Sequence, residues 1–354
     1  MYVKRNLTLP FVLRYTWFSL VWTTLYAVAM LTAFFQLDIK WIDVPFELVS
    51  AVGIAVAFFI GFKNNQAYER FWEGRKVWGG IVNYSRLWAT QVISLIAPPH
   101  GSGPDREAFV REQRRILIYR HLAWINALRV QLRQPTNFAV KENVLVERLV
   151  AAHSDDAQVS DVIAPFVSPE EGRSLAARKN VATQLVRAQA EHLGTLRRAG
   201  NLLDGFDHMM LMGTLEKAHN LQGMCERIKN TPFPRQFAYF SQVFTIIFCL
   251  LLPLGLLDVY EKELVAGVAF AQTFDTPYAP TAATLFVMVP LSVLVSWIFL
   301  TWEKIGDSSE DPFEGRPHDV SMTALCRTIE IDLRDMLDET DLPAKVAAKD
   351  HILY

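Results

Sequence analysis

The stretch GIAVAFFIGFKNNQAYERFWEGRK, residues Gly53–Lys76, decides the fold because it begins as membrane sequence and ends as charged, aromatic-rich sequence with no proline between. Its first half is almost entirely apolar, and its second half carries charged and aromatic side chains at helical spacing. We therefore predict one helix that leaves a membrane without breaking. Glycine at Gly74 would weaken this helix in isolation, so neighbouring helices must hold it.

Three bulky side chains recur in the apolar half at four-residue spacing. Ile54, Phe58 and Phe62 form one stripe along a helix, and small residues such as Gly61 permit close helix packing beside it. Such a stripe most often faces lipid or a bundle core. If identical helices surround an axis, it makes stacked apolar rings that can gate a pore by dewetting. The polar run Lys63–Gln66 follows the stripe, as a wet vestibule requires.

The composition of the chain favours a membrane part joined to a sizeable polar part. Of 354 residues, 51% are hydrophobic and 20% are charged. The formal net charge of −2 and the lack of a recognition motif argue against nucleic acid as a partner. The three cysteines are far apart, which indicates neither a disulfide framework nor a zinc site.

Four windows are apolar enough to cross a bilayer, which takes roughly 20 residues. Lysine and arginine are concentrated before the first window, between the second and third, and after the fourth, whereas the two short connecting loops are mostly acidic. The positive-inside rule then predicts a multi-pass protein of the inner (plasma) membrane with both termini in the cytoplasm. The windows are Trp17–Leu37, Val44–Phe62, Phe237–Leu257 and Pro277–Trp302.

These windows divide the chain into four parts, and the fold class predicted for all of them is all-α. The parts are residues 1–62 with the first two membrane helices, 63–235 as a cytoplasmic helical domain, 236–303 with the last two membrane helices, and 304–354 as a cytoplasmic tail.

Amphipathic patterns give the expected helices of the polar parts. In the middle segment they cover Glu112–Val130, Phe138–Ala152 and Ser174–Ile228, with loops at Ala97–Asp105 and Arg133–Asn137. In the tail, Gly306–Val320 reads as irregular because of its proline and glycine content, and Met322–Leu337 as a helix that packs back on the cytoplasmic domain.

No catalytic signature is found, so an enzyme is not predicted. The patterns of zinc proteases, serine hydrolases and phosphate-binding loops do not occur, and His192, His208 and His219 lack metal-ligand spacing. A membrane enzyme and a membrane-anchored binding or signalling protein remain as alternatives. A monomer or dimer in detergent would favour the signalling protein.

Three motifs stand out beyond these patterns. They are NNQAYERFWEGRKVWG at Asn64–Gly79, NTPFPRQFAYF at Asn230–Phe240, and EDPFEGRPHDVSMTALCRTIEIDL at Glu310–Leu333. Together they resemble the bestrophin family, in its bacterial branch, and the similarity covers nearly the whole chain. The resemblance implies a homopentameric ion channel in the lipid bilayer, with four membrane helices and a helical cytoplasmic domain per subunit around one central pore.

The resemblance also assigns roles to residues of this sequence. In the family the second membrane helix lines a narrow neck with three apolar rings. Their offset from the family motif Arg70–Phe71–Trp72 places them at Ile54, Phe58 and Phe62. A second, cytoplasmic constriction is implied upstream of the PFP motif, within Phe206–Met212, where the candidates are Phe206 and Met209.

The chain departs from the family at the motif Pro312–Phe313. Animal members follow this motif with aspartates that bind calcium, whereas here Arg316 stands in the corresponding stretch. Three carboxylates before the motif, Asp307, Glu310 and Asp311, could bind calcium weakly, but we interpret them as solvated or as anchors of the tail. No cofactor and no metal are therefore predicted.

Ion preference must come from the vestibules, because apolar rings carry no sign. Asp38, Asp43 and Glu47 lie near the external start of the pore helix, and a ring of carboxylates concentrates cations. The family's bacterial members favour small monovalent cations, so a channel for sodium or potassium is predicted, with a chloride channel of the same fold as the alternative. Lys63 would oppose this preference if it faced the axis. Further acidic candidates in the second loop are Asp258, Glu261, Glu263 and Asp275.

Overall fold

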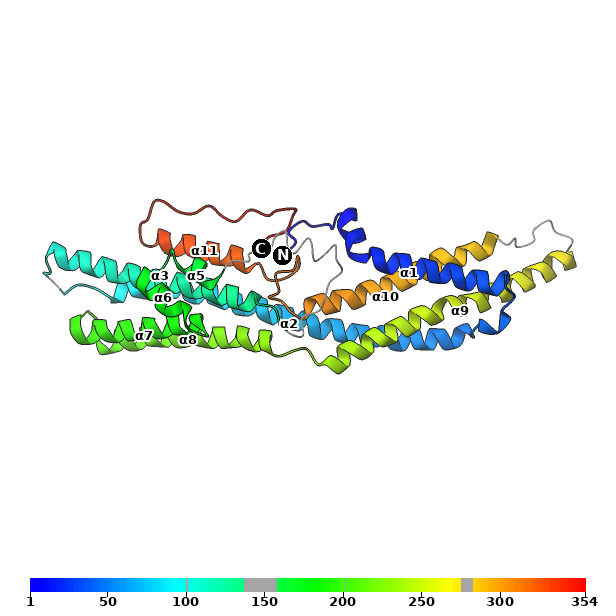
Figure 1. Ribbon diagram of the computed structural model, residues 1–354, viewed down its shortest axis with the longest axis horizontal. Coiled ribbons are helices and arrows are strands. Elements are labelled where there is room, and N and C mark those ends of the chain that lie inside the picture. The colour runs from blue at the N-terminus through cyan, green and yellow to red at the C-terminus, as the bar shows by residue number, and fades with distance from the viewer. Residues whose placement is uncertain (100, 137–157, 201, 275–282) are drawn as a thin grey trace.

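The computed structural model describes residues 1–99, 101–136, 158–200, 202–274 and 283–354. Over these residues the molecule is long and almost entirely helical, with a half of apolar helices and a half of amphipathic helices placed end to end (Figure 1). The predicted helix over residues 138–152 lies outside the described residues, and so do Asp275 and the start of the fourth window.

Within the residues that the structure describes, the apolar half contains four helices long and apolar enough to cross a membrane, which confirms the four predicted spans. A buried cluster that includes Phe34, Val56, Phe248 and Met288 holds them together. The third span continues well past Leu257 as a helix. The helices are α1 (Leu9–Phe35), the first part of α2 (Phe46–Leu95), α9 (Arg235–Phe274) and α10 (Ala283–Ser309).

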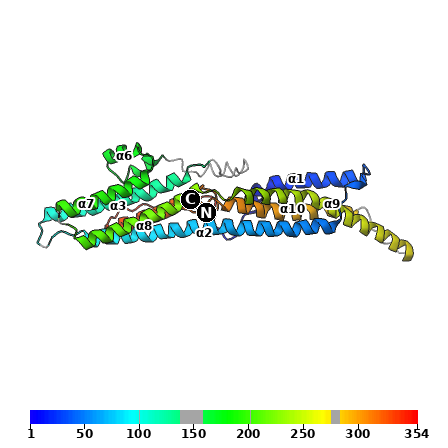
Figure 2. The ribbon, with the colours of Figure 1, turned by 90° about the horizontal axis from the view of Figure 1, so that it is seen from below.

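Helix α2 runs through both halves of the molecule as one helix of 50 residues, as predicted (Figure 2). At 1.5 Å per residue it is about 75 Å long. It packs against α9 and α10 in the apolar half and against α8 and α11 in the other. The boundary predicted at residues 62 and 63 falls inside this helix.

The amphipathic half is built on three buried tryptophans, Trp78, Trp88 and Trp124, which belong to one large hydrophobic core. The tail helix α11 packs on α2 and α3, which confirms that the tail returns to this half. Besides the end of α2, the described helices of the amphipathic half are α3 (Pro104–Arg133), α5 (Val159–Ile163), α6 (Pro169–Ala176), α7 (Val181–Gly200), α8 (Gly205–Asn230) and α11 (Met322–Asp335).

Two sequence predictions of helix boundaries are wrong. The segment Ser174–Ile228 is not one helix, because capping side chains begin new helices within it. Asn180 accepts a hydrogen bond from the backbone N–H of Thr183 at 3.0 Å, and Asp204 caps the first turn of α8. The prediction that the tail is irregular from Gly306 fails as well, because α10 continues to Ser309.

The two ends of the chain lie together near the middle of the molecule (Figure 1). Tyr2 and Ile352 form an isolated antiparallel bridge. The backbone N–H of Val3 donates to the carbonyl of His351 at 2.9 Å, and that of Leu353 donates to the carbonyl of Met1 at 2.8 Å. The N-terminal segment is thereby held at the junction of the two halves.

Candidate functional site

The apolar stripe of α2 lies on a face of this helix that the described part of the chain leaves uncovered. Ile54, Phe58 and Phe62 are 63%, 65% and 70% exposed, whereas Val56 and Ile60 on the opposite side are buried. The stripe residues line one groove together with Ala57, Gly61 and Asn65. The three side chains of the predicted stripe therefore lie on one exposed face of α2. The covered side of α2 is the side that faces α9 and α10.

Polar side chains continue the same face of α2 below the stripe. Glu69 follows Phe62 by seven residues, a spacing that places both on one side of a helix. Glu69 is exposed, and the Asn65 side-chain amide donates to its carboxylate at 3.2 Å. Glu69 is not among the residues predicted from sequence, although its spacing from Phe62 is a signal that the sequence contains.

Lys63 does not share this face. It is 4% exposed, and its ammonium donates to Glu303 and to Asp307 on α10. The positive charge that would have opposed a cation preference is thus paired within the chain.

Arg70 joins the ends of two helices to α2. Its guanidinium donates to the carbonyls of Ile228 and Thr231 at the end of α8, and to the Glu310 carbonyl just after α10. The carboxylate of Asp311 lies 3.7 Å away. Because helix C-termini carry partial negative charge, a cation is favoured at this meeting point. The family motif residue Arg70 therefore has a structural role in this chain.

The remaining motif residues divide between the core and the surface. Phe313 is buried and packs on α2 at Gly74, where a Cβ atom would come within 3.0 Å of Pro312 and 3.2 Å of Phe313. Phe71 packs against the hydrophobic core. Trp72 is exposed and stacks on Tyr68 with ring centroids 6.4 Å apart. Gly74 thus weakens the helix locally but admits the Pro312–Phe313 turn.

The interpretation of Glu310 and Asp311 as solvated is wrong, because both side chains are buried. Glu310 accepts a hydrogen bond from Arg235 at 3.1 Å, and its second carboxylate oxygen has no partner among the described residues. Burial, with a further contribution from the charge of Asp311, raises the pKa of Glu310 to about 7. Their role as anchors agrees with the contacts of Arg70 and Arg235.

Replacing Glu310 by glutamine is expected to reduce the loss of stability on raising the pH. Because the folded-state pKa is raised above 4.5, the stabilising contribution is fully present below about 4.5 and is lost as the pH rises through about 7. Since one pKa unit corresponds to about 1.4 kcal/mol, the free energy of unfolding of the native chain should fall by about 3 kcal/mol more than that of the variant. Thermal unfolding of both proteins at pH 5 and pH 8 measures this difference. Parallel pH profiles would contradict it.

Most of the acidic side chains predicted for an external vestibule are accessible. Asp38 and Glu47 are exposed and Asp43 is half-buried. The described residues include no ion pair to any of these three, whereas the two lysines nearby each form an ion pair with another carboxylate. Lys40 pairs with Glu261 at 3.1 Å, and Lys262 pairs with Asp258 at 2.8 Å.

Asp258 is not a vestibule residue as predicted. It is buried, and it accepts a hydrogen bond from the backbone N–H of Phe46 at the start of α2 at 3.3 Å. Its carboxylate therefore fixes the first turn of α2 instead of facing solvent.

At the far end of the amphipathic half, Phe206 and Met209 are exposed on the first turns of α8. Large apolar side chains that are left exposed mark surfaces for contact or function. Both residues stay candidates for the second constriction. Within the described part of the chain, no group of three or more His, Cys, Asp or Glu side chains could hold a metal ion.

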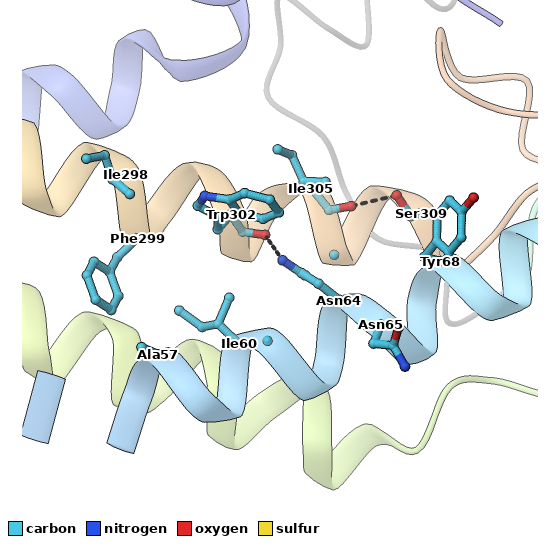
Figure 3. A pocket seen from close by; sticks show the side chains of 12 residues that line it. Ala57, Ile60, Asn64, Asn65, Tyr68, Ile298, Phe299, Trp302, Ile305 and Ser309 are labelled. Atoms are coloured by element: carbon cyan, nitrogen blue, oxygen red, sulfur yellow. Dashed lines mark hydrogen bonds between the residues drawn. The ribbon is translucent and has the colours of Figure 1, made fainter. Parts of the chain in front are cut away.

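A pocket of about 620 Å³ lies on the flank of α2 between this helix and α10 (Figure 3). Its membrane-side wall is apolar, with Ile60, Ile298 and Phe299, and its other end carries polar side chains such as Asn64. The side-chain amide of Asn64 reaches from α2 to α10 and donates to the carbonyl of Trp302 at 3.1 Å. The pocket thus adjoins the exposed stripe on one side.

Comparison with known proteins settles the family. The model of the family described as bacterial/fungal bestrophin protein matches residues 5–274 and 273–335. The chain belongs to the bacterial/fungal bestrophin family. Members of this family are channels and not enzymes, which agrees with the prediction from sequence.

Relatives of this bestrophin are similar over most of their length. A Salmonella typhi protein named "Voltage-dependent anion channel-forming protein YneE" is 29% identical, over 90% of this chain and 84% of the relative. The Escherichia coli K12 protein of the same name is 28% identical, over 92% and 86%. The crystal structure of a bacterial bestrophin homologue from Klebsiella pneumoniae has the same fold, with a TM-score of 0.68, 23% identity, and coverage of 91% of this chain and 98% of the homologue.

Proposed function

We propose that this bestrophin forms a homopentameric ion channel of the inner (plasma) membrane, with both termini in the cytoplasm and five α2 helices around a central pore. The exposed stripe carries the proposal. Ile54, Phe58 and Phe62 are apolar yet uncovered on a helix whose other side is packed, and Asn65 and Glu69 continue the same face with polar groups. A face that is apolar and then polar along one line fits a narrow neck above a wet vestibule.

The two flanks of α2 support a ring of subunits. On one flank an aromatic ridge joins α2 to α9, with Phe59 5.6 Å from Phe244, Phe244 5.7 Å from Phe240, and Phe240 5.6 Å from Tyr239. On the other flank lies the pocket between α2 and α10. A ridge and a hollow on different sides of one subunit fit a head-to-tail interface, which closes into a ring. The number five rests on membership of the family.

The charges along this path favour cations. Asp38, Asp43 and Glu47 would form acidic rings at the external mouth, and Glu69 would form one below the neck. Such rings concentrate cations and repel anions. Because Lys63 is paired inside the subunit, its positive charge does not oppose a preference for cations. We therefore propose sodium or potassium as the permeating ion, with passive flow and hydrophobic gating at the neck.

A chloride channel of the same fold is the second candidate. The names of the relatives favour it, since those from Salmonella typhi and Escherichia coli are called anion channel-forming proteins. The two candidates share the neck and differ only in the sign of the selected ion.

The reversal potential of the purified protein in planar bilayers under a KCl gradient distinguishes these candidates. For the native chain, we expect a shift toward the potassium equilibrium potential. For Glu69→Gln, the loss of five carboxylates below the neck should reduce this shift. Glu191→Gln, at an exposed position on α7, is the matched control and should behave like the native chain.

A native reversal potential near the chloride potential would overturn the cation assignment and keep the channel. Absence of current together with a monomeric or dimeric mass in detergent would overturn the channel itself. That outcome would instead favour the membrane-anchored signalling protein.

A further inference from the structure

An ion triad of two buried side chains, Lys63 and Glu303, and the half-buried Asp307 lies directly behind the apolar stripe. The ammonium of Lys63 on α2 donates to the carboxylates of Glu303 and Asp307 on α10, the latter at 2.5 Å. The second oxygen of Glu303 accepts a hydrogen bond from the hydroxyl of Ser241 on α9 at 2.7 Å. One cation and its partners therefore connect three of the four membrane helices.

Such charges are expensive to bury beside a bilayer. Taking an ammonium and a carboxylate out of water costs more than their attraction often returns, and apolar side chains of similar size would pack at least as well. Ionisable residues inside membrane segments therefore usually serve a function. Helix association alone does not require this triad.

The triad also defines how α2 is turned about its own axis. Phe62 and Lys63 are neighbours, and successive residues of an α-helix point about 100° apart. Phe62 is 70% exposed and Lys63 is 4% exposed, so the two adjacent residues mark the open and the covered side of the helix. Rotating α2 would pull the ammonium away from both carboxylates and leave buried charges unpaired.

The next residue restricts rotation further. The side-chain amide of Asn64 donates to the Trp302 carbonyl (Figure 3). Glycine at Gly306 leaves room for this contact, because a Cβ atom there would collide with the Asn64 side-chain oxygen. Lys63 and Asn64 thus fix the same seam between α2 and α10 through different chemistry.

We propose that Lys63 is a positioning residue of the neck, which fixes the rotation of α2 so that Phe62 faces the pore. This proposal rests on the pore function proposed above. It assigns to Lys63, Glu303 and Asp307 a role in setting which side chains the permeating ion meets, although none of the three lies on the pore face.

Cysteine accessibility tests this role. Phe62→Cys and Phe59→Cys lie about 60° apart around the helix, and block of current by a charged, water-soluble methanethiosulfonate reports the reaction of each. The native cysteines Cys225, Cys249 and Cys326 are buried and serve as the background. Both reporters are measured with the native triad and with Lys63→Met, Glu303→Gln and Asp307→Asn combined, which leaves no unpaired charge.

With the native triad, Phe62→Cys should react much faster than Phe59→Cys. In the neutral background we expect the ratio of the two rates to fall about tenfold, which corresponds to a loss of about 1.4 kcal/mol of rotational preference. Arg86 and Asp332 form a distant ion pair that joins α2 to α11, with 2.7 Å between the guanidinium nitrogen and the carboxylate oxygen. Neutralising this pair should leave the ratio unchanged. If the neutral background does not assemble, Asp307→Asn alone should lower the ratio about threefold.

Two failures can be told apart. A ratio unaffected by removal of the triad, with Phe62→Cys still blocking current, would overturn the positioning role and keep the pore. If the reagent does not block Phe62→Cys with the native triad present, both the neck and the role of Lys63 behind it are overturned.

Discussion

Replacing Ile54, Phe58 and Phe62 together by alanine is expected to give a several-fold larger single-channel conductance and a current that closes less completely. Each replacement removes a bulky side chain from a ring that five subunits would bring to the axis. A wider, shorter apolar passage is easier to wet, so the barrier to a hydrated ion falls. Single-channel recording in planar bilayers measures the change.

The matched control takes three apolar residues that are also exposed but lie on α9. Ile246, Ile247 and Leu250 replaced together by alanine remove exposed apolar surface away from the stripe. This control should conduct like the native chain, and both triple variants should fold, because the exposed side chains contribute little to packing within the subunit. Unchanged conductance in the stripe variant would remove the neck from the mechanism.

Replacing Arg70 by methionine is expected to lower the free energy of unfolding by about 3–5 kcal/mol. The guanidinium serves three backbone carbonyls from two helix ends as well as the carboxylate of Asp311. Without it the partly buried carbonyl groups and the buried carboxylate of Asp311 lose this donor. Thermal unfolding in detergent, together with the yield of assembled protein, measures the loss.

Lysine at the same position should rescue little of this stability. Its ammonium is a compact charge and cannot reproduce the planar fork that reaches several carbonyls at once. Arg187→Met, at an exposed position on α7, is the control and should change stability by less than about 0.5 kcal/mol. A loss at Arg70 as small as this control would show that the contacts at the junction are not needed for stability.

The sequence predicted best what depends on local pattern. The four spans follow from long apolar windows, and the continuity of α2 follows from helical spacing that no proline interrupts. The stripe residues could be named because a four-residue period is visible without any tertiary information. Their place at a pore axis, and the assignment of Phe206 and Met209, still depend on the family.

The sequence could not supply contacts between distant segments. Lys63 lies next to the stripe along the chain, but its partner Glu303 is 240 residues away, so neither its burial nor its pairing has a local signal. Asp258 reads as a loop carboxylate until its contact with the start of α2 is seen. The caps at Asn180 and Asp204 were hidden because the apolar pattern continues on both sides of each.

The separation of Lys63 from its partners also bears on how the protein is made. Lys63 enters the nascent chain long before Glu303 and Asp307, so the triad closes only after the last span has been synthesised. Until then a positive charge stands at the end of the second span that we propose to be cytoplasmic, where positive charge helps to orient a membrane helix. The same lysine can thus serve twice, first in setting the topology of its span during insertion and later in joining that span to the finished bundle.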